Sequence, residues 1–203
     1  MLPGPLIPGQ TPIDDLSGLK VKGITTQAEL NAHEAENIRK AVLKYLGAKP
    51  TRRSAKFDVR WALRLHAEMF GHIWQWAGQP RTQELNIGSP PHQVSVDLLN
   101  LLEDLKVWQK SGMPLQEQAV RLHHRAVKIH PFLNGNGRWS RLLANIWLKL
   151  HGAAPIDWPE AVIGTSSVVR DEYIAAIKAA DNHDFAPLKA LHERFTPQPP
   201  RSS

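Results

Sequence analysis

Apolar side chains recur every three or four residues along most of this chain, which is the spacing of helices that bury one face. The repeat is clearest beyond position 136, where the apolar positions are Trp139, Leu142, Leu143, Ile146, Trp147 and Leu150. Similar patterns predict further helices over residues 26–46, 54–70, 95–108, 114–130, 167–180 and 184–195. The pattern therefore predicts an all-α fold.

Several polar residues and one proline mark where these helices should begin. Thr26 and Glu29 have the spacing of a capping box, in which each side chain accepts a hydrogen bond from the backbone N–H of the other. Ser54 and Ser95 stand where they would cap the next two helices. Pro114 suits the first turn of a helix, where its missing N–H costs nothing.

Residues 79–94 break the helical pattern. They are poor in helix formers, and Asn-Ile-Gly at 86–88 is followed by two prolines. Such a composition favours a turn-rich hairpin or loop between two helices.

Composition sets the limits on domain number. With 203 residues, seven Trp and 42% hydrophobic side chains, the chain can bury one sizeable core, and we expect a single domain over residues 20–195. The Pro/Gly-rich residues 1–19 are expected to form an extended arm, and the polar residues 196–203 a flexible tail.

Other features narrow the class of protein. The chain has no cysteine, which excludes disulfides and thiolate metal sites. Its first residues lack the charge and apolar core of a signal peptide, and no apolar run is long enough to span a membrane. We therefore expect a cytoplasmic protein with no membrane partner. The formal net charge of +6 suits either an anionic small molecule or nucleic acid, so charge alone does not choose between them.

The residues that follow His130 carry the clearest chemistry; they read His-Pro-Phe-Leu-Asn-Gly-Asn-Gly-Arg-Trp-Ser-Arg. Gly135 and Gly137 can take positive φ at the start of a helix, where converging N–H groups and the helix dipole favour an anion. Arg138 and Arg141 would emerge together from the first turn as phosphate partners. His130, just before the loop, is suited to act as a general base. This run predicts a phosphate cradle with a base beside it.

Simpler interpretations exist for each of these features. A histidine such as His130 is more often packed or solvated than catalytic, and a Gly-Asn-Gly run can be ordinary turn chemistry. His123 and His124 invite a metal site, but adjacent helical residues point about 100° apart and do not share a face. Arg52 and Arg53 fit a solvated loop, and the tryptophans at helical spacing fit the core.

The run from His130 to Arg141 resembles the signature of the Fic (Fido) family, His-Pro-Phe-x-(Asp/Glu)-Gly-Asn-Gly-Arg-x-x-Arg. The matching positions are His130, Pro131, Phe132, Gly135, Asn136, Gly137, Arg138 and Arg141. Asn134 stands where the family has an acidic residue. Further similarity lies in residues 65–82, 86–88 and 180–188. The subgroup that the chain most resembles is the one called mobile mystery protein B.

The resemblance implies a Fic-fold helical bundle with a short β-hairpin flap. It also implies a protein adenylyltransferase that moves AMP from ATP onto a Ser, Thr or Tyr hydroxyl of a target protein, with no need for nucleic acid. His130 would deprotonate that hydroxyl, and Arg138 would neutralise charge on the phosphate chain. Arg141 would meet the terminal phosphate or pair with an inhibitory glutamate. The α- and β-phosphates would be held by Gly135, Asn136 and Gly137.

Position 134 affects the metal that the resemblance implies. The family's acidic residue there ligates Mg²⁺, and the amide oxygen of Asn134 is a weaker ligand for this hard cation. Mg²⁺ would then bind mainly through ATP and water, or turnover would be slow, or the chemistry would differ. A kinase branch of the superfamily has lysine at the position of Gly137, so the glycine favours AMP transfer.

The resemblance also implies a target-docking surface and a mode of inhibition. The flap would hold a segment of the target by strand addition, using Glu84, Leu85, Asn86, Ile87 and Gly88. Many relatives are inhibited by a glutamate within Ser/Thr-x-x-x-Glu-Gly/Asn, a pattern that Glu36 and Glu29 each match only in part. Without an internal inhibitor, we expect either a toxin-like component with a separate antitoxin-like partner or weak intrinsic activity.

Two alternatives to AMP transfer remain open at the level of sequence. The first is transfer of another phosphate-containing group, as in a kinase, because Asn134 departs from the signature. The second is a basic module that binds nucleotide without turnover.

Overall fold

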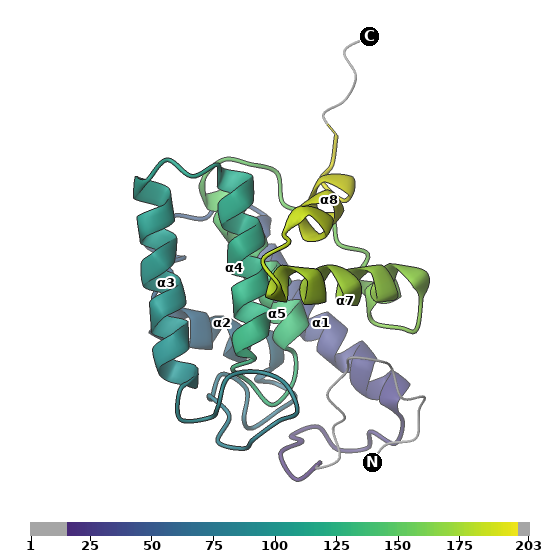
Figure 1. Ribbon diagram of the computed structural model, residues 1–203. Coiled ribbons are helices and arrows are strands. Elements are labelled where there is room, and N and C mark those ends of the chain that lie inside the picture. The colour runs from purple at the N-terminus through teal and green to yellow at the C-terminus, as the bar shows by residue number, and fades with distance from the viewer. Residues whose placement is uncertain (1–15, 199–203) are drawn as a thin grey trace.

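The computed structural model describes residues 16–198, which form eight helices (Figure 1). They are α1 (Gln27–Leu46), α2 (Val59–Phe70), α3 (Val94–Lys110), α4 (Leu115–Ile129), α5 (Asn136–Leu150), α6 (Glu160–Ile163), α7 (Val168–Asp181) and α8 (Ala186–Arg194). The all-α prediction is therefore confirmed. No helix in the described part of the chain is long and apolar enough to cross a membrane.

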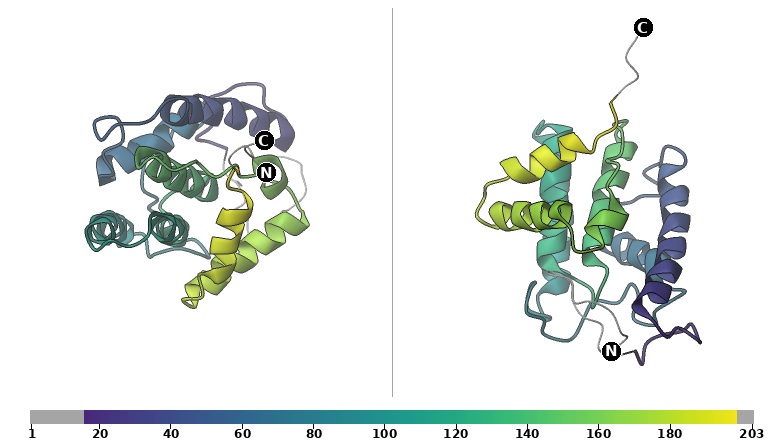
Figure 2. Two further views of the ribbon diagram at one scale, coloured as in Figure 1. Left: turned by 90° about the horizontal axis from the view of Figure 1, so that it is seen from above. Right: turned by 90° about the vertical axis from the view of Figure 1, so that its right-hand side faces the viewer.

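Helices α4 and α5 form the centre of the fold. They pack closely against each other, with α3 beside α4, while α1 and α2 lie on one side of the pair and α7 and α8 on the other (Figure 2). One core cluster fills the space among α1, α2, α3, α4 and α5. A second cluster joins α7 and α8 to α4 and α5. The loop between α4 and α5 thus sits on a rigid pair of helices.

The predicted start of the first helix is confirmed. Thr26 Oγ1 accepts from the Glu29 N–H at 3.2 Å, and Glu29 Oε2 accepts from the Thr26 N–H at 3.0 Å, which completes the capping box. Helices α4, α5, α7 and α8 also lie where the apolar pattern placed them. Pro114 precedes the first residue of α4 as its N-cap.

The predicted cap at Ser54 is wrong. Asp58 is the N-cap of α2 and accepts from the Trp61 N–H at 2.7 Å, while Ser54 closes a turn with Thr51. The cause is Phe57, whose φ of 51° is incompatible with a continuous helix. Phe57 nevertheless packs against Trp61, so the apolar spacing correctly predicted that Phe57 is buried.

Two smaller differences concern α3 and α6. Ser95 lies inside the first turn of α3 and is not its cap, because a turn through Pro90 and Gln93 runs directly into the helix. The four-residue helix α6 was not predicted, since it is too short to show a period.

The flap contains no strand anywhere between residues 79 and 93, so the predicted β-hairpin is wrong in this structure. The side chain of Arg81 occupies the middle of the loop and donates to three carbonyls: His130 O at 2.7 Å, Gln83 O at 2.9 Å, and Ser89 O. The flap backbone pairs with the motif loop instead of with itself, through Arg81 N–Pro131 O (2.9 Å) and Ser89 N–Ile129 O (3.1 Å).

Predictions for the two ends of the chain fall largely outside the described residues. Positions 1–15 of the predicted arm and 199–203 of the predicted tail are not described. The division into arm, domain and tail therefore stays a prediction.

Candidate active site

The loop between α4 and α5 is held in shape by its own side chains. His130 ends α4 in the left-handed region, with φ 53°, and Gly135 precedes α5 with φ 79°. The Asn136 side chain accepts from the Phe132 N–H at 2.9 Å and donates to Phe132 O at 2.8 Å. Asn136 thus braces the loop with its side chain, and only its backbone N–H is available to an anion at the helix start.

His130 is buried and uncharged. Only 7% of its surface is exposed, and Nδ1 lies 3.3 Å from Val127 O. Burial is the main cause that lowers the pKa of His130 to about 4. The hydrogen bond to Val127 O acts to raise this pKa, and the positive charge of Arg81 acts to lower it. A carbonyl can only accept, so a proton on Nδ1 leaves Nε2 as the basic nitrogen. At neutral pH the side chain is in the form that a general base requires.

The two glycines of the motif differ in conformation. A Cβ at Gly135 would lie 2.6 Å from the Phe70 ring, so both space and positive φ require glycine there. Gly137 is helical, which corrects the expectation of positive φ, and a Cβ would approach only Arg141 Nη1, at 3.4 Å. The first N–H groups of α5 face a cleft and have no partner within the helix.

Arg138 lies between a carboxylate and an amide. Its Nη1 donates to Glu34 Oε2 at 2.6 Å, and its Nη2 lies 3.3 Å from Asn134 Oδ1. Asn134 Oδ1 also accepts from the Gly135 N–H at 2.6 Å, and the Arg138 guanidinium lies 4.8 Å from the Phe70 ring centroid. The amide at position 134 therefore supports Arg138 and the turn.

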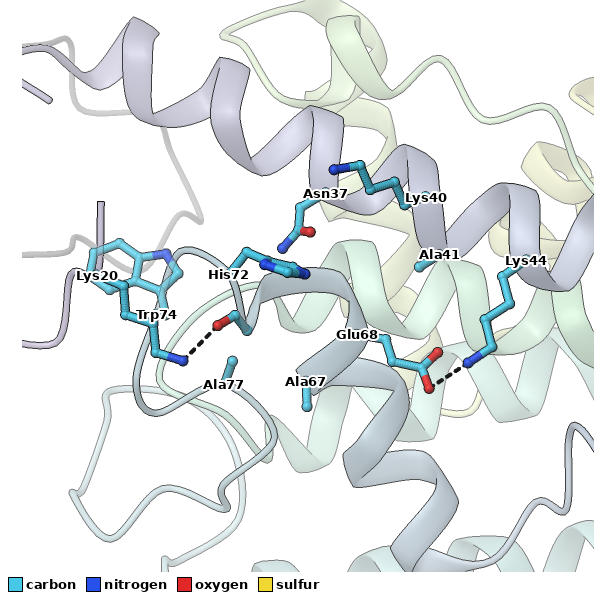
Figure 3. A pocket seen from close by; sticks show the side chains of 11 residues that line it. Lys20, Asn37, Lys40, Ala41, Lys44, Ala67, Glu68, His72, Trp74 and Ala77 are labelled. Atoms are coloured by element: carbon cyan, nitrogen blue, oxygen red, sulfur yellow. Dashed lines mark hydrogen bonds and ion pairs between the residues drawn. The ribbon is translucent and has the colours of Figure 1, made fainter. Parts of the chain in front are cut away.

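Glu34, on α1, was missed by sequence reasoning. It is 2% exposed, and its Oε1 accepts from Trp74 Nε1 at 2.7 Å. Trp74 also lines a smaller cleft of about 560 Å³ between α1 and α2, where Lys44 pairs with Glu68 (Figure 3). The one sequence signal that could have pointed to a role for Glu34 in the site is its position on the buried face of α1.

Arg141 is 4% exposed and makes a bidentate ion pair with Glu160 of α6. Burial lowers the pKa of Arg141, but the carboxylate of Glu160 outweighs it, so the pKa lies above its usual value. The guanidinium carbon lies 5.2 Å from the ring centroid of Tyr173. His123 lies behind this tyrosine, with Nε2 2.9 Å from the hydroxyl.

The two glutamates that match the inhibitory pattern only in part contact other residues. Glu29 forms the cap of α1, and Glu36 pairs with Arg39 at 2.9 Å on an exposed surface. The structure gives Arg141 another partner, Glu160, because the fold brings the short helix α6 back to α5.

His130, the cradle and the flap line one cleft of about 1410 Å³. The faces of α1 and α7 that flank the motif form its other walls. Of the predicted docking residues, Ile87 and Gly88 line this cleft, whereas Glu84, Leu85 and Asn86 do not. The volume exceeds that of a usual small-molecule pocket, which leaves room for part of a second substrate.

The described residues contain no cluster of three or more histidine or acidic side chains that could hold a metal ion. In the cradle the protein offers one amide oxygen, Asn134 Oδ1, which already accepts two N–H groups. These residues fit a metal ion only if phosphates and water supply most of its ligands.

Several known proteins are similar to this chain. It is 29% identical over 151 residues to the protein adenylyltransferase Fic of Drosophila ananassae, an alignment that covers 72% of this chain and 29% of that protein. The fold matches the N-terminal Fic domain of a VirB-translocated Bep effector from Bartonella quintana, with TM-score 0.65 and 25% identity over 91% of each chain. It also matches BepC from Bartonella tribocorum with bound AMPPNP, with TM-score 0.65 and 23% identity over 92% of this chain and 96% of that one.

The chain thus spans less than a third of the length of the Drosophila protein. A family model described as Fic/DOC matches residues 56–148, which include α2 through most of α5 and therefore the whole loop from His130 to Arg141. Motif, fold and site geometry agree with this match, so residues 56–148 resemble a Fic/DOC domain.

Proposed function

We propose that this protein is an adenylyltransferase that transfers AMP from ATP to a Ser, Thr or Tyr hydroxyl of a target protein. The observation that carries the proposal is that a neutral His130 and the N-terminus of α5 line the same cleft. Support comes from relatives named protein adenylyltransferase Fic, and from similar structures with bound ADP or AMPPNP.

In the proposed reaction, the target hydroxyl oxygen attacks the α-phosphorus of ATP. A bond forms from that oxygen to phosphorus, the bond to the bridging α–β oxygen breaks, and pyrophosphate leaves. His130 Nε2 accepts the hydroxyl proton. The N–H groups at the start of α5 and the guanidinium of Arg138 stabilise charge on the phosphates. Catalysis of this kind depends mainly on positioning and electrostatics.

Mg²⁺ is proposed to enter with the nucleotide. It would supply charge neutralisation on the phosphates, and Asn134 is the protein residue placed to hold it or a water in its shell. The cradle residues act on the nucleotide in their own right, through N–H groups and Arg138.

We infer that the structure represents a resting form. Glu160 forms an ion pair with Arg141, the residue that the motif assigns to the terminal phosphate. This ion pair must therefore open when ATP binds. The exposed side chain of Glu160 (46%) is consistent with such a displacement. A cytoplasmic, toxin-like role with an antitoxin-like regulator remains part of the proposal, as does the mobile mystery protein B subgroup.

The target is proposed to pass along the flap beside Ile87 and Gly88, which line the cleft. Ile87 is 47% exposed, so it can make an apolar contact with a target segment. Because the flap contains no strand, this contact does not depend on a preformed β-hairpin.

The proposal is tested by incubating the protein with candidate targets and ATP labelled at the α- or the γ-phosphate. Label transferred to protein only from the α-position supports AMP transfer. Label only from the γ-position would instead show a kinase. Nucleotide binding without any transfer, measured by calorimetry with ADP, would indicate a binding module and overturn the proposal.

A further inference from the structure

His66, on α2, is a buried histidine with no part in the reaction described above. It has 0% of its surface exposed and lies between the flap and the motif loop. Its ring stacks on Phe132, with centroids 3.6 Å apart and an interplanar angle of 15°, and lies 4.6 Å from the Phe70 ring centroid. Aromatic packing thus fixes the plane of the imidazole.

Hydrogen bonds fix its tautomer. Nδ1 accepts from the Gly78 N–H at 3.0 Å, and Nε2 lies 3.0 Å from Asn134 O. Because a carbonyl can only accept, Nε2 carries the proton. Burial lowers the pKa of His66 to about 3, although the bond to Asn134 acts in the opposite direction. Around neutral pH, therefore, the ring is neutral with both nitrogens bonded.

Both bonds end beside a tight turn of the backbone. Gly78 has φ 79°, and a Cβ there would lie 2.7 Å from the side chain of Ala67. Gly135, which follows Asn134, also has φ 79°, and a Cβ there would lie 3.2 Å from His66 Nε2. One imidazole thus contacts the chain at the residue before the flap and at the turn that begins the cradle.

We propose that His66 is a positioning residue that holds the flap and the phosphate cradle, each through one ring nitrogen. Its Nδ1 holds the base of the flap. Its Nε2–H holds the Asn134 carbonyl, which sets the direction of the Gly135 amide and of the α5 N-terminus. The effect on nucleotide rests on the proposed function, whereas the anchoring of the two segments rests on the contacts of His66 alone.

Two substitutions separate the two bonds. The amide of asparagine lies as far from Cα as Nδ1 does, so His66→Asn can still accept from Gly78 but does not reach Asn134 O. The amide of glutamine lies one bond further out, as Nε2 does, so His66→Gln can still donate to Asn134 O. His66→Phe keeps an aromatic ring and removes both bonds.

His151→Asn is the matched control. The ring nitrogens of His151 lie 2.9 Å from Trp147 O and 2.9 Å from Gln109 Nε2, at the opposite end of α5 from the cradle. Like His66→Asn, it can keep the contact made by Nδ1, here with Trp147 O, and loses the contact made by Nε2, without touching flap or motif loop.

Two measurements are made on each full-length variant: ADP affinity by calorimetry, and hydrogen exchange of the flap amides, residues 79–93. For His66→Asn we expect ADP affinity to fall about 10-fold, as for one lost buried hydrogen bond, with flap exchange within about twofold of wild type. For His66→Gln we expect flap exchange to rise about 10-fold, with ADP affinity within about threefold. His66→Phe should show both changes, and His151→Asn neither.

Equal effects of the asparagine and glutamine variants on both measurements would show that the two ring nitrogens do not hold separate segments, and would overturn the proposal. So would wild-type behaviour in all three variants, or the same changes in His151→Asn. If the wild-type protein fails to bind ADP, the proposed function is wrong, and the exchange difference between His66→Asn and His66→Gln still decides whether Nδ1 of His66 holds the flap.

Discussion

His130 and Asn134 are the single residues on which the proposed chemistry depends most. His130 is held in a left-handed conformation, with Arg81 bonded to its carbonyl at 2.7 Å, so the backbone as well as burial sets its side-chain position. Asn134 supplies a neutral oxygen where a charged one is expected from the motif, and it accepts from Arg138 and from the Gly135 N–H. Each residue has a substitution that isolates its role.

Replacing His130 with alanine should reduce AMP transfer by about 10²–10⁴-fold, because the base is lost. ADP affinity should remain within about threefold of wild type, because His130 is proposed to act on the hydroxyl and not on the phosphates. Loss of one hydrogen bond to the nucleotide would lower the affinity by more than this. Transfer is measured with α-labelled ATP, and affinity by calorimetry. A variant that transfers AMP at the wild-type rate would remove His130 from the mechanism.

Asn134→Asp should strengthen Mg²⁺ binding and raise activity if weak metal affinity is the only consequence of the amide. The side chain keeps its size, so the bond from the Gly135 N–H (2.6 Å) should persist. The rate of transfer is measured against Mg²⁺ concentration for both proteins, and a shift to lower concentration is expected. If the aspartate enzyme is no better at any concentration, weak metal affinity does not explain the effect of the amide, and altered chemistry is favoured.

At the scale of elements, the N-terminus of α5 and the short helix α6 bear most on the proposed phosphate site. The first two turns of α5 contain the N–H groups and both arginines. Helix α6 brings Glu160 to Arg141 from outside the motif. The first element carries the groups proposed to bind phosphate, and the second places a carboxylate against one of them.

Gly135→Ala and Gly137→Ala should separate folding from binding. Alanine at 135 meets the Phe70 ring at 2.6 Å in a left-handed conformation, so the free energy of unfolding should fall. Alanine at 137 replaces a helical glycine and should stabilise the fold by about 0.5–1 kcal/mol. Its methyl would stand where phosphate approaches the helix, so ADP affinity should fall. Urea denaturation and calorimetry test both, and unchanged ADP affinity in Gly137→Ala would place the phosphates elsewhere.

Glu160→Gln should release Arg141 and increase ADP or ATP affinity by up to about fivefold, the equivalent of the ~1 kcal/mol of a partly exposed ion pair. The increase should be larger for ATP than for ADP, because Arg141 is assigned to the terminal phosphate. Calorimetry with both nucleotides measures it, and Glu172→Gln, which breaks the exposed pair with Arg194, serves as the control. Equal affinities in wild type and Glu160→Gln would show that the ion pair does not compete with nucleotide.

Across the whole molecule, the two core clusters meet along α4 and α5, and buried neutral histidines lie in both regions. His123 Nδ1 lies 2.9 Å from His192 Nε2, and burial lowers the pKa of both, that of His192 to about 3. His66 and His130 are similarly shifted, to about 3 and about 4. The fold therefore keeps several imidazoles uncharged at once.

These shifts make stability depend on pH. In the unfolded chain each histidine takes up a proton below its ordinary pKa of about 6.5, whereas the folded groups stay neutral until about pH 3–4. The stabilisation is complete above pH 6.5 and is lost as pH falls toward those folded values. Each such group should lower the free energy of unfolding by about 1.4 kcal/mol per pH unit below 6.5.

Urea denaturation at pH 7.5, 6.0 and 5.0 tests this dependence. His192→Asn should unfold with a shallower pH dependence than the wild-type protein, because one titrating group is removed. A free energy of unfolding that stays constant from pH 7.5 to 5.0 would contradict the buried, neutral state of these histidines.

The sequence by itself determined the features that are local or periodic. The apolar spacing placed α1, α4, α5, α7 and α8, because a helix that buries one face repeats its apolar residues at the helical period. The capping box at Thr26 was readable because both partners lie within one turn. The start of α5 was readable for the same reason, since its glycines, asparagine and arginines lie within seven residues of the chain.

Only the tertiary structure decided which distant groups meet those local features. Glu34 and Glu160 reach Arg138 and Arg141 across separations of 104 and 19 residues, and neither contact has a period or a motif. The flap was predicted as a hairpin, but its backbone pairs with the motif loop and surrounds Arg81. Its shape, like the partners of both arginines, is set by contacts between segments distant in the chain, and local propensity does not encode such contacts.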